Sequence, residues 1–203
     1  PGLSIGGSSQ IDLEGQFMGG NATQACNGIE VVDSQDLRFV GSALSGYGSN
    51  GWGFVVFNCS NFDLSGQMIG NGNGQSVGLI AYQSSNFTIE GDISGPFGLI
   101  VSQSSNWFIS GEIYGRDFGS ILTDTSNISI NGNLTSHFTG FSITGVSNLT
   151  FNGNLAAIAG FTIHSSSNFD IHCNLKTSSD AFSATNSSNF TFDGSIGSFV
   201  GIG

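Results

Sequence analysis

Apolar and polar positions alternate in short runs along this chain, and the runs return at a nearly constant interval. Each run follows an anchor position, usually the Asn of a Ser-Asn pair, and apolar residues stand one and three positions after it. Such alternation with a period of two predicts a β-strand. Successive anchors are 26, 25, 25, 20, 21, 21, 20 and 21 residues apart. The chain therefore carries an internal repeat, and nine anchors predict nine to ten coils of a solenoid.

The anchors share a chemistry as well as a spacing. Gln10 and Asp36 hold the anchor position in the first two copies, and asparagine holds it in the other seven. We expect these asparagines to turn inward and to form a hydrogen-bonded ladder along one turn, as stacked amides do in cross-β structures. The ladder residues are Asn61, Asn86, Asn106, Asn127, Asn148, Asn168 and Asn189.

Glycine marks the corners of each coil. It stands five positions after every anchor except Asn168, which Cys173 follows at that distance, and in most copies eight positions before the anchor. We therefore predict an all-β solenoid with three short strands per coil, folded as one domain over residues 1–203. No segment keeps apolar residues at the period of a helix. Phe62, Phe87 and Trp107 are expected to form an aromatic stack inside it.

The coil motif resembles that of a known superfamily. Residues 84–91 read Ser-Ser-Asn-Phe-Thr-Ile-Glu-Gly, and residues 187–194 repeat the pattern. This is similar to the coil motif of the right-handed parallel β-helix proteins, the pectin-lyase-like superfamily, and the similarity covers essentially the whole chain. The resemblance implies a right-handed coil. The superfamily includes polysaccharide lyases and hydrolases, phage tailspikes, adhesins and surface fibres, and this chain resembles the fibres and tailspikes more than the enzymes.

Charge excludes several classes of partner. The chain has 14 Asp or Glu residues against three Lys or Arg, and a net charge of −11. Nucleic acid and anionic membrane surfaces are attracted to clustered basic residues, so neither is an expected partner. No apolar run approaches the ~20 residues of a membrane-spanning helix, so we expect no membrane insertion. The three cysteines lack the spacing of a zinc site, and we expect no metal or cofactor.

The acidic residues include the best candidates for a catalytic or metal site. Glu90, Asp92 and Glu112 are predicted to lie on neighbouring coils, where they could bind calcium or form a carboxylate pair. A solvated acidic edge is the interpretation we favour, and Arg116 is expected to pair with Asp117 or Glu112. His172 is predicted to face outward beside Asp170. We therefore predict that the protein is not an enzyme, with a polysaccharide lyase or hydrolase as the less favoured alternative.

Asn-x-Ser/Thr sequons are frequent along the chain, and the predicted solenoid sorts them. Those at anchors are expected to be turned inward and out of reach, whereas four others lie in loops, at a corner or on an outward position. We predict N-linked glycans at Asn21, Asn58, Asn133 and Asn186. Glycans at these sites would place the protein outside the cell, at a surface.

One predicted outer face is apolar. Six positions before the anchor, successive coils carry Val55, Ile80, Ile100 and Ile121, and Phe57 and Tyr82 stand beside them. An exposed apolar stripe indicates a contact surface, unless a longer loop from the first coils folds over it. Gly2 and Gly201 occupy nearly the same phase of the coil, which favours head-to-tail stacking of copies.

These patterns predict an extracellular structural protein, a glycosylated solenoid subunit of a surface filament or adhesive fibre. A carbohydrate-binding module of the tailspike type is the first alternative, with Tyr47, Trp52 and Tyr82 stacking on sugar rings. An ice-binding surface is a further alternative, which the irregular outward threonines disfavour.

Overall fold

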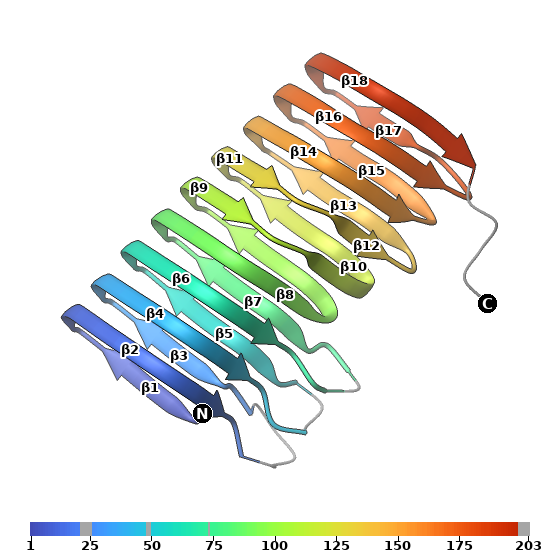
Figure 1. Ribbon diagram of the computed structural model, residues 1–203. Helices are drawn as coiled ribbons and strands as arrows, with labels where there is room; N and C mark the ends of the chain where they lie inside the picture. Colours follow the sequence, from blue (N-terminus) through green and yellow to red (C-terminus); the bar gives the residue numbers. More distant parts are fainter. Residues whose placement is uncertain (21–25, 48–49, 73, 199–203) are drawn as a thin grey trace.

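The chain forms a parallel β-solenoid. The computed structural model describes residues 1–20, 26–47, 50–72 and 74–198. Within these residues the protein has eighteen β-strands and no helix, and every strand pairing is parallel and joins one coil to the next. Figure 1 shows the coils stacked into a rod, with the first and last strands at opposite ends. The predicted all-β solenoid is confirmed.

The strands follow one another along the chain without intervening elements of another kind. They are β1 (Leu3–Gly6), β2 (Ser9–Met18), β3 (Ile29–Val32), β4 (Gln35–Leu44), β5 (Trp52–Phe57), β6 (Ser60–Ile69), β7 (Val77–Tyr82), β8 (Ser85–Ser102), β9 (Ser105–Ser110), β10 (Ile113–Thr123), β11 (Ser126–Asn131), β12 (Leu134–Ser136), β13 (Thr139–Thr144), β14 (Ser147–Ala157), β15 (Ala159–His164), β16 (Ser167–Thr177), β17 (Phe182–Thr185) and β18 (Ser188–Ser198).

Each coil, here called a rung, has the same parts. A short return strand leads into a tight turn that holds the anchor, and a long strand then runs away from the turn. In the third rung, β5 is the return strand and β6 is the long strand. Nine long segments stack through eight successive pairings, from β2 to β18. The described rod therefore makes about eight turns.

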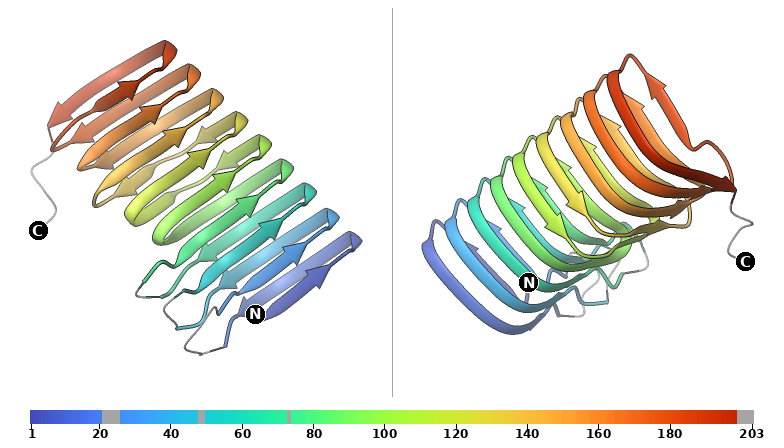
Figure 2. Two further views of the ribbon diagram at one scale, coloured as in Figure 1. Left: turned by 180° about the vertical axis from the view of Figure 1, so that it is seen from behind. Right: turned by 45° about the horizontal axis from the view of Figure 1, so that its top comes forward.

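The coil is right-handed. In Figure 1 the long strands lie in front and run toward the lower right, while the fainter return strands run the opposite way behind them. The chain advances toward the upper right as it circulates, which defines a right-handed helix. Figure 2 shows the return strands from behind, stacked as a continuous sheet.

The long strand bends at a glycine and usually does not break there. We call the segment before the glycine the first arm and the segment after it the second arm. Gly132 has a φ of 155°, which favours glycine, and a Cβ there would overlap the carbonyl group of Gly111 in the preceding rung. The three predicted strands per coil are therefore three faces, two of which belong to one bent strand in most rungs. In β8 even the next return strand is continuous with the arms.

Like residues stack on like inside the rod. Phe62 pairs in register with Phe87, and Phe87 with Trp107. Their ring centroids are 4.8 Å and 4.2 Å apart, and the Phe87 and Trp107 rings are parallel within 1°. The predicted aromatic stack is confirmed, and it belongs to one apolar core that follows the rod from rung to rung.

Candidate functional site

The turn before each long strand is the most regular polar feature of the molecule. Two residues in each turn adopt the left-handed conformation, the anchor and the residue three positions before it. In the third rung these are Asn61 (φ 60°) and Asn58 (φ 52°). Asparagine enters this conformation more readily than most residues, which explains its recurrence at the anchor. The turn therefore fixes where each anchor side chain stands.

The anchor side chains form the predicted ladder. From Asn61 to Asn189, each Nδ2 donates a hydrogen bond to the side-chain Oδ1 of the preceding anchor, at 2.9–3.0 Å. The series begins at Asp36, whose Oδ1 accepts from Asn61. However, all seven asparagines are exposed, so the prediction that they turn inward is wrong. The left-handed backbone directs the anchor side chain to the outside of the turn.

A second ladder, which the sequence analysis missed, occupies the inside of the turn. Two positions before the anchor, small side chains form a row that is buried through most of the rod. The hydroxyl of Ser84 accepts from the backbone N–H of Cys59 at 3.2 Å and donates to the carbonyl of Tyr82 at 2.7 Å. Ser34, Ser104, Ser166 and Ser187 repeat these contacts. We call this row the hydroxyl ladder.

Cys59 takes a serine position in the hydroxyl ladder. Its Sγ accepts from the N–H of Ser34 at 3.4 Å and lies 3.1 Å from the carbonyl oxygen of Phe57. Burial raises the pKa of the Cys59 thiol, and burial raises that of Cys173 to about 11. Both side chains therefore stay protonated at neutral pH, which is the form that can donate to a carbonyl and the less reactive form of a thiol.

The predicted glycan sites differ in how their amides are used. Asn21 lies outside the described residues. Asn58, Asn133 and Asn186 are all exposed. Asn58 donates to Asp33 at 2.7 Å, and Asn133 accepts from Asn154 at 2.8 Å within a further ladder on the second arms. Asn186 makes no side-chain hydrogen bond with any described residue. Glycan occupancy stays a prediction, and the exposure of the anchors removes the reason for excluding their sequons.

The predicted apolar stripe is partly covered by the protein itself. Val55 is 8% exposed and Ile80 is 4% exposed, so the prediction of an open surface is wrong at these two positions. They pack with residues at the beginnings of nearby return strands. We call this the outer cluster, which contains Trp52, Val55, Val77, Ile80, Phe97 and Ile100.

The remainder of the stripe lies beside the outer cluster. Ile100 and Ile121 are half-buried, whereas Phe57 and Tyr82 are exposed and pair in register. Of the three aromatic residues considered for sugar stacking, Tyr47 and Tyr82 are exposed and Trp52 is half-buried as a member of the outer cluster, so sugar binding stays a prediction. A role of the stripe as an interface stays a prediction.

The acidic candidates do not assemble into a cluster that fits a cation. Asp92 accepts the backbone N–H of Glu112 at 3.2 Å, and Glu90 lines a separate open groove with Asp63 and Arg38. Among the described residues, no group of three or more His, Cys, Asp or Glu side chains is placed to hold a metal ion. The carboxylates instead follow the outer surface of the arms, as a solvated acidic edge would.

A shallow groove of about 350 Å³ follows the second arms from Glu112 to Lys176. Tyr114 lines the groove, and its hydroxyl lies 3.4 Å from Nε2 of His137. Both side chains are exposed. Among the described residues at the groove, this long contact is the only one between titratable side chains that resembles an acid–base pair.

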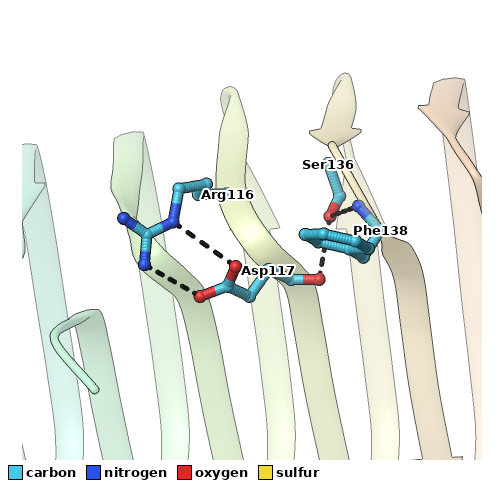
Figure 3. A network of polar contacts seen from close by, with 4 residues as sticks. All are labelled: Arg116, Asp117, Ser136 and Phe138. Atoms are coloured by element: carbon cyan, nitrogen blue, oxygen red, sulfur yellow. Dashed lines mark hydrogen bonds and ion pairs between the residues drawn. The ribbon is translucent and has the colours of Figure 1, made fainter. Parts of the chain in front are cut away.

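Arg116 and Asp117 lie at the corner beside this groove. Their side chains form a two-point pair, with N–O distances of 3.3 Å and 3.1 Å, so Asp117 rather than Glu112 is the partner of Arg116 (Figure 3). Asp117 raises the pKa of the Arg116 guanidinium. The Asp117 carbonyl accepts from Ser136, whose hydroxyl accepts the N–H of Phe138 (Figure 3). This network fixes the corner between adjacent rungs.

The last two rungs carry a histidine between two carboxylates. Nε2 of His172 lies 3.0 Å from Asp170, as the sequence predicted, and Nδ1 lies 3.5 Å from Asp193 in the next rung. All three side chains are exposed, so the contacts are weak.

Comparison with known proteins adds no relative. No family model, no curated protein and no solved structure matches this chain. The described part of the chain also contains no helix that is long and apolar enough to cross a lipid bilayer. The architecture is that of a parallel β-helix.

Proposed function

We propose that this protein is a structural rod of the cell exterior that associates end to end into a filament or adhesive fibre. One observation carries the proposal. Phe190 and Ile196 of the last rung are 41% and 56% exposed, whereas Phe169 and Leu175, which stand one rung inside, are 2% and 1% exposed. The last rung therefore exposes apolar side chains at positions that are buried in the preceding rung, and no further rung among the described residues covers them.

The first rung presents the matching surface. Its inward residues are half-buried, although the same positions of the next rung are buried. These residues are Leu3, Ile5, Ile11, Leu13 and Phe17. Full burial of an aliphatic or aromatic side chain contributes roughly 1.5–3 kcal/mol, so several such residues at each end favour a further rung supplied by another copy. Unpaired strand edges at both ends favour the same contact.

The surface chemistry suits a glycosylated, extracellular setting. The exposed faces carry Asn, Ser and Thr with few charges, and Asn58, Asn133 and Asn186 offer sequons on outward positions. Glycans there would hydrate a rod that has little charge of its own. The resemblance to surface-fibre and tailspike members of the pectin-lyase-like superfamily favours the same setting.

Negative-stain electron microscopy with light scattering over a concentration series tests the association. We expect particles whose length grows in steps of about 43 Å, since nine rungs stack at ~4.8 Å. Ile196→Lys should give single rods because it places a charge in the apolar junction. The matched control Thr191→Lys, on an outward position of the same strand, should assemble as the original protein does. Single rods of the original protein at all concentrations would overturn the proposal.

A further inference from the structure

We propose that the rods join in one polarity, with the last rung of one copy seated on the first rung of the next, and that both turn ladders continue across the junction. The new contacts are Gln10 to Asn189 and Ser8 to Ser187. This inference rests on the end-to-end association proposed above and adds the direction of the junction and the groups that set it.

The anchor ladder has a direction. Each anchor donates to the rung before it, and Asn189 donates to Asn168 at 2.9 Å. The Oδ1 of Asn189 accepts from no described residue. At the other end, Gln10 has the anchor conformation (φ 55°), but the neighbouring Asp36 carboxylate only accepts. Asp36 therefore cannot donate to the Oε1 of Gln10 as the later anchors donate to the rung before them. The side-chain amide of Gln10 makes no hydrogen bond with a described residue, and its N–H groups fit the vacant acceptor of Asn189 in the preceding copy of the stack.

The hydroxyl ladder runs in the opposite direction. Here the backbone N–H of one rung donates to the hydroxyl of the following rung, as Ser8 N–H donates to Ser34 at 3.2 Å. The N–H of Ser187 would accordingly donate to a rung beyond the last one. The hydroxyl of Ser8 is oriented as a ladder acceptor, because it donates to the carbonyl of Gly6 at 3.1 Å. The first rung thus supplies the acceptor that Ser187 requires.

Because the two ladders run in opposite directions, they favour a junction between a first and a last rung over a junction between two like rungs. Contact between first and last rungs pairs a donor with an acceptor in both ladders. Contact between two last rungs would face Asn189 Oδ1 with another acceptor and the Ser187 N–H with another donor. Only the head-to-tail junction satisfies both ladders, and it alone keeps the strands parallel, as they are throughout the rod.

The apolar rows meet in the same register. When Asn189 stacks on Gln10, the bend glycines Gly194 and Gly15 coincide, and their φ angles are 148° and 134°. The inward pairs across the junction are Phe182 with Leu3, Ala184 with Ile5, Phe190 with Ile11, Phe192 with Leu13, and Ile196 with Phe17.

One pair opposes the contact. Asp193 comes to stand beside Glu14 on the outer face, about 4.8 Å away along the stack, and like charges in this arrangement repel. Association should therefore increase several-fold between low and moderate salt, because salt screens exposed charges. Asp193→Asn should give a similar increase at low salt and remove most of the salt dependence.

Variants blocked at one end test the polarity. Phe192→Asp blocks the last rung, and Leu13→Asp blocks the first. Each variant alone should be monomeric by light scattering, and an equimolar mixture should form dimers of one copy of each. Ser195→Asp and Gln16→Asp, outward positions on the same strands that face a neutral side chain across the junction, should still form filaments. Circular dichroism checks that each variant is folded.

The outcomes separate the two proposals. If like ends joined, each blocked variant alone would form a homodimer through its intact end, which overturns the polarity and leaves end-to-end association standing. If the original protein is monomeric, both proposals fail. Gln10→Glu supplies a milder test, because it replaces an N–H donor with a second acceptor opposite Asn189 while leaving the apolar row intact. We expect about ten-fold weaker association, and unchanged association would overturn the ladder contact.

Discussion

The outer face of the return strands changes chemistry between rungs three to six, here called the first half, and the last three rungs, here called the second half; rungs one and two carry Ser4 and Glu30 in the same row. In the first half, Val55 and Ile80 form a second apolar layer outside the coil, covered by Trp52, Val77 and Phe97. In β13, β15 and β17 the same outward row carries Ser142, Thr162 and Ser183, and no cluster covers it among the described residues. The backbone pairing is the same in both halves, so the outer layer is an addition to the fold and not a requirement of it.

The second half adds polar ladders where the first adds apolar contacts. Asn152 donates to Asn131 at 2.8 Å, and Asn154 and Asn174 extend a parallel series along the second arms. A hydrogen bond of this kind contributes roughly 0.5–1.5 kcal/mol, whereas burial of an isoleucine contributes roughly 1.5–3 kcal/mol. One rung geometry can therefore be held by either chemistry, and each buried apolar residue of the first half contributes more to the free energy of unfolding than each hydrogen bond of the second half.

The largest loss of stability should come from substituting a bend glycine, a feature that both halves share. Gly132→Ala is expected to lower the free energy of unfolding by more than ~3 kcal/mol, because the added Cβ would overlap the Gly111 carbonyl and the φ of 155° disfavours a side chain. Gly66→Ala, at the bend of an earlier rung, should cost as much. Gly197→Ala is the control, because a Cβ there meets no atom within 4 Å. Denaturant unfolding measures all three, and a small loss at Gly132 would contradict this account of the bend.

Truncating an outward side chain of a return strand should cost clearly more stability in the first half than in the second. Ile80→Ala removes a side chain buried in the outer cluster and is expected to cost about 2–4 kcal/mol. Thr162→Ala occupies the same row of the second half, where the side chain is exposed, and is expected to change stability by less than ~0.5 kcal/mol. Equal costs in denaturant unfolding would show that the outer cluster adds no stability and would remove the contrast.

The sequence predicts the rung but not the direction in which every side chain points. Period-two alternation and the bend glycines identify the faces, the aromatic stack and the existence of an anchor ladder. They do not show that a left-handed residue directs its side chain outward while the residue two positions earlier points in. A signal for the hydroxyl ladder was present, because that earlier position holds a small or medium uncharged residue in every copy.

The sequence pattern also could not show that other side chains of the outer cluster cover Val55 and Ile80, and the reason is different. Trp52, Val77 and Phe97 stand nine positions before their anchors, on the far side of the corner glycine. Whether they reach over Val55 and Ile80 depends on the angle of that corner, which residue type alone does not fix. The Tyr114–His137 contact joins neighbouring rungs near a register shift in β10, and a single repeat period cannot place it.

The smallest change in stability should come from substituting Asp36, the anchor that accepts a hydrogen bond but cannot donate one. Asp36 accepts from Asn61 but cannot donate to Gln10, so Asp36→Asn keeps the first bond and adds a second. We expect a gain of about 0.5–1 kcal/mol in the free energy of unfolding.

The reverse change further along the anchor ladder, Asn127→Asp, should cost a similar amount. It removes the bond that Asn127 donates to Asn106, although the bond accepted from Asn148 can remain. Thermal unfolding of both variants measures the pair of effects with opposite signs. Since Gln10 keeps its own N–H donors in the Asp36→Asn variant, end-to-end association should stay unchanged in light scattering. A loss of association there would mean that Gln10 turns toward its own chain, and that the junction depends on Asp36 being unable to donate.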